Sequence, residues 1–409
     1  MSAGQGDDPV VRALLVENIH PDAVRVLESE GFEVELLERA LPEPELVEKL
    51  AGVHLLGIRS GTNVTAVALA AAPDLLAVGA FCIGTNQIDL HRAAEAGVAV
   101  FNAPFSNTRS VVELALAEII ALTRRLTGKN AAMHEGVWDK SATGSHEVRG
   151  RRLGIVGYGN IGTQLSVLAE NLGLGVWFYD TSDRLALGNA RRCGTLEELL
   201  ESVDIVTLHV DGRPDNQDLF GEAQFARMRP RSLFLNLSRG FVVDHAALRR
   251  HIESGHLAGA AIDVFSEEPR SKAEPFVSEL RGLPNVILTP HVGGSTEEAQ
   301  QDIGNFVANK LRKYVLAGST SLSVNLPSLE LPERPGCCRL AHIHRNVPGV
   351  LAEANSIVAR HAINVEGQIL GTRGEVGYVL TDVGSAVDEA LVKELSAMEA
   401  TVSLRLLEL

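Results

Sequence analysis

The chain has 409 residues, 45% of them hydrophobic, and a formal net charge of −15 at pH 7. This length allows two or three domains with cores of their own. The negative charge argues against nucleic acid or an anionic membrane as the main partner, but it leaves room for a basic pocket that binds an acidic metabolite. The N-terminus lacks the basic and apolar regions of a secretory signal, and no apolar run approaches the roughly 20 residues of a membrane helix, so we expect a cytoplasmic protein.

The cysteines predict neither a disulfide framework nor a metal site. They are Cys82, Cys193, Cys337 and Cys338. Their spacing does not match a set of zinc ligands, and two adjacent cysteines cannot comfortably close a disulfide. We therefore expect a reducing compartment and no metal cofactor.

Short apolar runs alternate with amphipathic segments between residues 11 and 104. The runs are RALLV, FEVELL, VHLLGI, LLAVGAF and VAVFNAP. This strand-then-helix rhythm is typical of an open parallel sheet, so the first hundred residues are predicted to form an α/β unit of their own. A long amphipathic helix is predicted from Ser110, followed by a polar loop in which Trp138 is expected to be exposed or at an interface.

The same rhythm restarts at Leu153. The runs LGIVG, VWFYD, DIVTLHV, SLFLNLS, GAAIDVF and NVILTPH predict six strands of a doubly wound parallel sheet. A helix over residues 295–318 and a proline-marked linker that ends near Gly336 follow. The remaining segments have the β-α-β-β-α-β order of a ferredoxin-like fold, which predicts a further domain.

A glycine motif, GIVGYGNIGTQL, opens at Gly154 and predicts a dinucleotide site. Gly157 permits the tight turn, Gly159 lets the backbone approach a pyrophosphate, and Gly162 allows the helix to pack on its strand. Asp180 ends the next strand, 18 residues after Gly162. A carboxylate at this place accepts hydrogen bonds from the ribose hydroxyls and so favours NAD over NADP. The alternatives are glycines in an ordinary strand-helix turn and a plain surface carboxylate.

Three polar residues follow predicted strands of the second sheet, at the edge where open α/β sheets bind ligands. Arg239 follows SLFLNLS, Glu268 follows GAAIDVF, and His291 closes NVILTPH. An arginine binds a carboxylate in bidentate fashion, a histidine exchanges a proton near neutral pH, and a carboxylate stabilises the imidazolium. The set suits hydride transfer at a 2-hydroxy or 2-oxo acid. A structural histidine and an arginine that binds cofactor phosphate remain the alternatives.

With these motifs, the chain resembles the D-isomer-specific 2-hydroxyacid dehydrogenases, in their three-domain bacterial form. The stretches that carry the resemblance are GAFCIGTNQIDL, FNAPFSNTRSV, LGIVGYGNIGTQL, LNLSRG, GAAIDVFSEEP, LTPHVGGST and LAHIHRNVPGVL. The resemblance implies a flavodoxin-like substrate-binding domain that is interrupted by a Rossmann-type NAD-binding domain, with a ferredoxin-like ACT domain at the end. The implied boundaries are 1–106 and 298–332 for the substrate-binding domain, 107–297 for the NAD-binding domain, and 333–409 for the ACT domain.

The resemblance also assigns residues. It implies that Arg239 binds the substrate carboxylate, that Glu268 is the partner of the histidine, and that His291 is the acid-base residue. The implied NAD contacts are Gly157, Gly159, Asn160, Ile161, Gly162, Asp180, Leu237, Ser238, Arg239, Asp263, His291, Val292, Gly293 and Gly294. The implied substrate contacts are Arg59, Ser60 and Asn107, and the implied effector contacts are His344, Asn346 and Asn364.

The activity that the resemblance implies is the NAD-dependent oxidation of 3-phospho-D-glycerate to 3-phosphohydroxypyruvate, the first step of L-serine biosynthesis. L-Serine is the implied effector, and a homotetramer with Trp138 against a neighbouring subunit is the implied assembly. Three positions depart from the family: Gly61 stands where a basic residue is common, Cys337 where a hinge glycine is common, and Cys338 where an arginine is common. Reduction of 2-oxoglutarate or another 2-oxo acid, and an NAD-sensing interaction protein, are the alternative functions.

Overall fold

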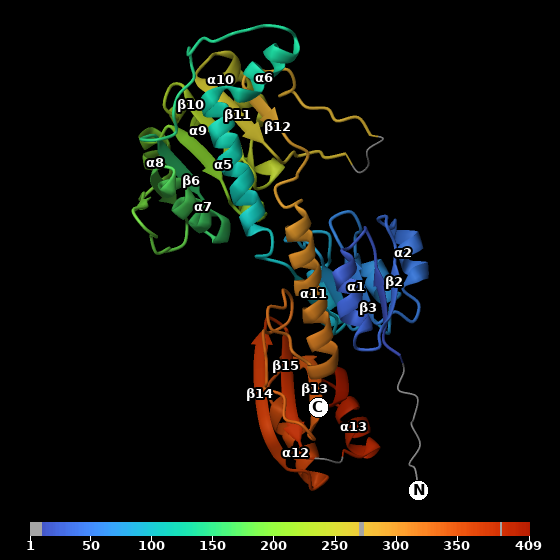
Figure 1. Ribbon diagram of the computed structural model, residues 1–409. Coiled ribbons are helices and arrows are strands. Elements are labelled where there is room, and N and C mark those ends of the chain that lie inside the picture. The colour runs from blue at the N-terminus through green and yellow to red at the C-terminus, as the bar shows by residue number, and fades with distance from the viewer. Residues whose placement is uncertain (1–9, 270–273, 385–386) are drawn as a thin grey trace. The chain divides into compact units, whose positions relative to one another are not determined.

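The computed structural model describes residues 10–269, 274–384 and 387–409. The chain divides into two compact units (Figure 1). Met1–Ser106 and Gln300–Leu409 make up the first unit, and Asn107–Ala299 make up the second. Within the described ranges, no helix is both long enough and apolar enough to cross a membrane.

The first unit contains a parallel sheet in the order β2-β1-β3-β4-β5. Its strands are β1 (Arg12–Leu15), β2 (Glu33–Leu36), β3 (Leu55–Ile58), β4 (Ala77–Ala80) and β5 (Ala99–Asn102). The helices between them are α1 (Pro21–Glu28), α2 (Glu43–Lys49), α3 (Ala66–Ala70) and α4 (Leu90–Glu95). All residues of β3, β4 and β5 are buried, as expected for parallel strands covered on both faces. The strand order is the flavodoxin-like one, so the predicted α/β fold is confirmed.

The tail of the chain forms an antiparallel sheet in the order β14-β15-β13-β16. Its elements are β13 (Cys338–Arg345), α12 (Val350–Arg360), β14 (Val365–Arg373), β15 (Val376–Val383), α13 (Glu389–Ser396) and β16 (Thr401–Glu408). This confirms the predicted ferredoxin-like order. Tyr378 of β15 packs in one hydrophobic core with Phe101 of β5 and with Tyr314 of α11 (Glu297–Ala317), and its hydroxyl donates to the Gly318 carbonyl at 2.6 Å. The tail and the parallel sheet therefore share a core.

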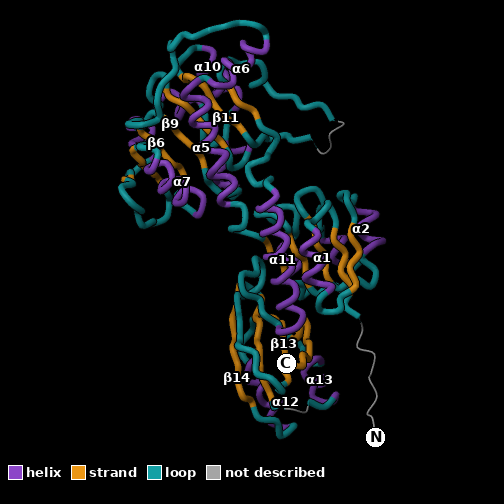
Figure 2. The backbone as a smooth tube through the Cα atoms, viewed as in Figure 1, coloured by secondary structure: helices purple, strands orange, loops and turns teal. Residues whose placement is uncertain are grey.

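The second unit contains a parallel sheet in the order β12-β11-β10-β9-β6-β7-β8. Figure 2 shows strands of this sheet in orange, with β6, β9 and β11 labelled. Its strands are β6 (Arg152–Val156), β7 (Gly175–Tyr179), β8 (Arg191–Arg192), β9 (Ile205–Leu208), β10 (Ser232–Asn236), β11 (Leu257–Ile262) and β12 (Val286–Leu288). Its helices are α5 (Thr108–Arg124), α6 (Leu126–His134), α7 (Asn160–Asn171), α8 (Leu196–Ser202), α9 (Glu222–Arg227) and α10 (His245–Glu253), with 3₁₀ turns at Pro214–Asn216 and Gly240–Val242.

The predicted doubly wound sheet is confirmed, with one strand more than expected. Strand β8 consists of Arg191 and Arg192 and pairs with β7 at the edge of the sheet. Two exposed arginines carry no apolar periodicity, so pattern reasoning could not find this strand. Trp138 is 71% exposed, as its polar loop predicted.

Candidate active site

The glycine loop after β6 has the geometry of a dinucleotide site. Gly157 has a φ of +91°, and a Cβ there would lie 2.5 Å from the His209 carbonyl oxygen. A Cβ on Gly162 would lie 2.3 Å from the Gly157 carbonyl oxygen, so helix α7 can approach its strand only with glycine at this position. Gly159, in contrast, faces open space, with no atom within 4 Å of its Cβ position. This opening lies at the N-terminus of α7, where Asn160 and Ile161 form the first turn and the helix dipole favours an anion.

Asp180 follows β7 and is tied to the glycine loop. Its carboxylate accepts hydrogen bonds from the backbone nitrogens of Tyr158 and Ser182, both at 2.8 Å. Arg184 lies 3.8 Å from the same carboxylate. The acid predicted to bind ribose is therefore held in a defined position beside the loop.

Arg239, Glu268 and His291 come together at the carboxyl edge of the sheet. They follow β10, β11 and β12, which are neighbours in the strand order. Nδ1 of His291 lies 2.9 Å from Oε2 and 3.1 Å from Oε1 of Glu268. Arg239 lies near enough to influence the ionisation of both residues. The residues that sequence spacing selected therefore form one cluster.

The histidine and the glutamate shift each other's pKa. The hydrogen bond to Glu268 raises the pKa of His291 above its ordinary value, against the opposing effects of burial and of Arg239. Burial raises the pKa of Glu268, but the hydrogen bond and charge of His291, with a backbone hydrogen bond from Phe265, lower it overall. A charged imidazolium is therefore stabilised at this position, which is the property that a proton-exchanging histidine requires.

Asp263 supports the backbone that carries His291. Its carboxylate accepts hydrogen bonds from the Thr289 hydroxyl at 2.6 Å and from the backbone nitrogens of Val292 and Gly293 at 2.8 Å. Its own carbonyl accepts the backbone nitrogen of His291 at 2.8 Å. His291 has a φ of +53°, an unusual conformation for a residue other than glycine, so these bonds hold a strained backbone in place.

Leu237 and Ser238 are buried beside Arg239, and they depend on Asn236, which the sequence reading did not select. The Asn236 side chain donates to the Arg239 carbonyl at 3.0 Å and accepts from both the backbone nitrogen and the hydroxyl of Ser238. A polar residue at the buried end of an apolar strand was the signal that could have found it.

Asn107 stands at the N-cap position of α5, where its side chain makes no capping hydrogen bond, and it lies against Gly294. A Cβ on Gly294 would come within 2.3 Å of Asn107 Nδ2, so the glycine allows this close approach. Asn107 Oδ1 is buried and has no hydrogen-bond partner among the described residues. The acceptor is therefore free for a ligand donor.

Arg59 and Ser60 belong to the first unit, where they follow β3. Glu17, which the sequence reading missed, organises this loop: its carboxylate accepts the backbone nitrogens of Arg59, Gly61 and Thr62 at 2.8–3.1 Å. Glu17 stands two residues after strand β1, and a carboxylate just past a buried strand was the available signal.

The three expected effector residues do not meet within one chain. His344 and Asn346 lie at one end of the tail sheet, where His344 pairs with Gly377. Asn364 precedes β14, whose first residue Val365 pairs with Val383 at the other end of β15. His344 Nε2 is buried and has no hydrogen-bond partner in the described part of the chain, so this ring nitrogen is available to a ligand.

Two further features lie near or beyond these residues. A cavity of about 640 Å³ adjoins His291 and Glu268 in the second unit, and Phe265, Phe276 and Arg281 are among the residues that line it.

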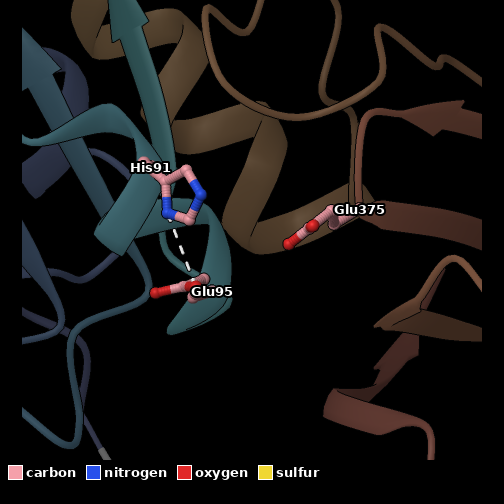
Figure 3. A group of neighbouring side chains, drawn as sticks. All are labelled: His91, Glu95 and Glu375. Carbon is pink, nitrogen blue, oxygen red and sulfur yellow. Dashed lines mark ion pairs between the residues drawn. The ribbon is translucent and has the colours of Figure 1, made fainter.

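In the first unit, His91, Glu95 and Glu375 could each place one ligand atom within 4.8 Å of the others (Figure 3). These three side chains are exposed, and Glu95 also forms an ion pair with Arg92, so we assign no metal to this cluster.

Comparisons with known proteins agree with this architecture. A family model described as the NAD binding domain of D-isomer specific 2-hydroxyacid dehydrogenases matches residues 116–293, and one described as an AHAS small subunit-like ACT domain matches residues 340–403. The D-3-phosphoglycerate dehydrogenase of Haemophilus influenzae is 48% identical over 402 residues, which cover 98% of each chain. That of Dictyostelium discoideum is 45% identical over 397 residues, or 97% of each chain. The solved structure of D-2-hydroxyisocaproate dehydrogenase matches with a TM-score of 0.69 at 25% identity and covers 77% of this chain and 100% of its own. The chain therefore belongs to the D-isomer-specific 2-hydroxyacid dehydrogenase family.

Proposed function

We propose that the protein oxidises 3-phospho-D-glycerate to 3-phosphohydroxypyruvate with NAD, the entry step of L-serine synthesis. The observation that carries this proposal is the His291–Glu268 pair with Arg239 beside it, at the edge of an NAD-type sheet. The full-length relatives of similar sequence are D-3-phosphoglycerate dehydrogenases, which favours this substrate over other 2-hydroxy acids.

The chain's residues divide the work of the reaction. NAD, when bound, supplies the hydride acceptor. His291 accepts the proton of the C2 hydroxyl on Nε2, because Nδ1 is held by Glu268. Glu268 stabilises the resulting imidazolium, and Arg239 orients the substrate carboxylate and polarises the reacting oxygen. Asp263 keeps His291 in its strained backbone conformation, so the imidazole is positioned before the substrate arrives.

The loop geometry supports the proposed cofactor contacts. We assign the pyrophosphate to the opening at Gly159 and the adenosine ribose to Asp180. The contacts Leu237, Ser238 and Val292 to Gly294 lie along the same edge, on the backbone that Asn236 and Asp263 hold. On the substrate side, Arg59 and Ser60 on the Glu17-supported loop of the first unit are proposed to bind the phosphorylated acid. Asn107, in the second unit, is proposed as a further substrate contact through its free Oδ1.

The tail is proposed to bind L-serine between two copies of the chain. His344 and Asn346 lie at one end of its sheet and Asn364 at the other, so an effector that contacts all three needs residues from two subunits. This site calls for an interface between two copies, and we propose that it belongs to a cytoplasmic homotetramer; the 71% exposure of Trp138 suits a contact with a further neighbouring subunit.

The experiment that tests this function is the steady-state rate of NADH oxidation with 3-phosphohydroxypyruvate and with 2-oxoglutarate, each with and without L-serine. A high rate with 3-phosphohydroxypyruvate that serine suppresses supports substrate and effector together. A rate with 2-oxoglutarate alone would contradict the proposed substrate. No turnover with either acid, with NADH still bound, would point to an NAD-sensing protein.

A further inference from the structure

Glu118 is a buried carboxyl group for which the reaction described above has no role. It lies on the core-facing side of α5, in the series Val111, Ala115, Glu118 and Leu122, where helical spacing calls for an apolar side chain. The residue is 3% exposed. Neither carboxylate oxygen has a hydrogen-bond partner within the described residues. Such a group costs stability unless it stays neutral or serves a function.

The surroundings of Glu118 connect it to the catalytic loop. Helix α5 packs against β10, β11, β12, α6 and α7. The polar groups that act on Glu118 from these elements are the Asp263 carboxylate, just after β11, and the Thr289 hydroxyl, just after β12. No charged group of α6, α7 or β10 contributes among the described residues. The Thr289 hydroxyl lies close enough to Glu118 to act on its ionisation, but it donates its proton to Asp263 and not to Glu118.

The same Thr289 hydroxyl donates to Asp263 at 2.6 Å. A hydroxyl has one proton to donate and two lone pairs that accept, so Thr289 can serve Asp263 and also accept a proton from a neutral Glu118. An ionised Glu118 could only accept, and it would compete with Asp263 for the single Thr289 proton. Its charge would also repel the Asp263 carboxylate, which holds the backbone of Val292 and Gly293.

We propose that Glu118 is a positioning residue: as a neutral carboxyl group it donates to Thr289, directs the Thr289 hydroxyl to Asp263, and thereby stabilises the backbone that carries His291. Burial first, and the Asp263 charge second, raise the pKa of Glu118 to about 8, so the neutral form prevails at neutral pH. Ionisation at higher pH loosens the support of His291. Glu118 therefore limits the alkaline range of the enzyme without touching the substrate.

Three variants test this inference. Glu118→Gln keeps the shape and a donor but cannot ionise, Glu118→Met removes every polar group, and Glu113→Gln is the control. Glu113 lies on the same helix, but its side chain is 60% exposed and pairs with Arg109. We expect Glu118→Gln to keep kcat within about twofold at pH 7 and Glu118→Met to lower it about three- to tenfold, the range of one hydrogen bond.

The decisive readout is the ratio of kcat for Glu118→Gln to kcat for the parent protein, measured with NADH and the preferred 2-oxo acid from pH 6.5 to pH 9.5. His291 titrates in both proteins, so its effect cancels, and the ratio should rise through about pH 8. A ratio that stays flat while the control behaves like the parent protein overturns the proposal.

Because the kinetic test rests on the proposed dehydrogenase activity, an infrared measurement accompanies it. The carbonyl stretch of a protonated carboxylic acid should be present at pH 7, fade through about pH 8, and be missing in Glu118→Gln. This test needs no turnover. A band unchanged by the substitution would refute a neutral Glu118, whereas a band without any dehydrogenase activity would refute the proposed function instead.

Discussion

Nδ1 of His291 lies 2.9 Å from Oε2 of Glu268, although the two residues come from different strand ends. The pair lies at the carboxyl edge shared by the parallel strands β11 and β12. Because Glu268 holds Nδ1, the imidazole has one nitrogen left for proton exchange. This relationship leads to the first two predictions.

Substitution of His291 by Asn should lower kcat by about two to four orders of magnitude, the usual contribution of a general acid-base residue. NADH binding, followed by cofactor fluorescence, should change little. The matched control is His251→Asn, because His251 pairs with Glu222 at 2.8 Å in the same unit, outside the proposed site. Near-full activity of His291→Asn would remove the assigned acid-base role.

Activity should depend on pH through His291, whose pKa lies above its ordinary value because of the hydrogen bond to Glu268. The oxidation needs neutral His291, so its rate should rise as pH increases through this pKa; the reduction needs the imidazolium, so its rate should fall. Glu268→Gln removes the interaction that favours the charged form and should move both transitions to lower pH. Profiles of kcat/KM in both directions measure this, and unshifted transitions would mean that Glu268 does not set the histidine's pKa.

Introduction of arginine at Gly61 should lower KM for a phosphorylated 2-oxo acid about three- to tenfold, by adding a charged donor on the loop that carries Arg59. A Cβ at this position would lie 3.0 Å from Glu17 Oε2 and 3.1 Å from the Ala40 Cβ, so both the Glu17 side chain and the segment that carries Ala40 must shift by a few tenths of an ångström to admit it. Gly128→Arg is the control, since Gly128 has no atom within 4 Å of its Cβ position. An unchanged KM would place phosphate recognition elsewhere.

Replacement of Asp180 by Ala should raise KM for NAD about tenfold and reduce the preference for NAD over NADP. The variant loses the ribose acceptor and also the bond to the Tyr158 nitrogen that steadies the glycine loop. Initial rates with each cofactor measure both effects. Asp183→Ala serves for comparison, because Asp183 is 92% exposed and pairs with Arg192; equal effects of the two substitutions would speak against a specific role for Asp180.

Disruption of the buried pair Arg339–Asp382 should destabilise the tail by about 3–5 kcal/mol. Both side chains are fully buried, and Arg339 also donates to the carbonyls of Ala317, Leu331 and Pro332. Arg339→Met leaves the Asp382 charge unpaired, whereas the exposed Arg345–Glu399 pair should contribute at most about 1 kcal/mol. Denaturant unfolding of Arg339→Met and Arg345→Met compares the two, and similar midpoints would contradict the prediction.

The strands, their carboxyl ends and the glycine loop could be predicted from the sequence, because each rests on a local pattern. Alternating apolar runs identify strands, and Gly157 and Gly162 stand where the backbone allows no Cβ. The positions of Arg239, Glu268 and His291 also follow from local order, since parallel strands place their ends at one edge. Supporting residues such as Glu17 and Asn236 escaped notice, because their partners are set by chain segments that the local pattern does not specify.

The sequence by itself determined the order of the main elements, the doubly wound and ferredoxin-like sheets and the chemical types at the strand ends, since these depend on periodicity and backbone sterics. Only the tertiary structure decided that Tyr378 joins the core of the parallel sheet, that Asn364 and His344 lie at opposite ends of the tail sheet, and that Glu118 approaches Asp263. Each of these relations joins residues distant in sequence. The free energy that stabilises these contacts comes from burial and from pairing between segments far apart in the sequence, and no single segment of the chain contains it.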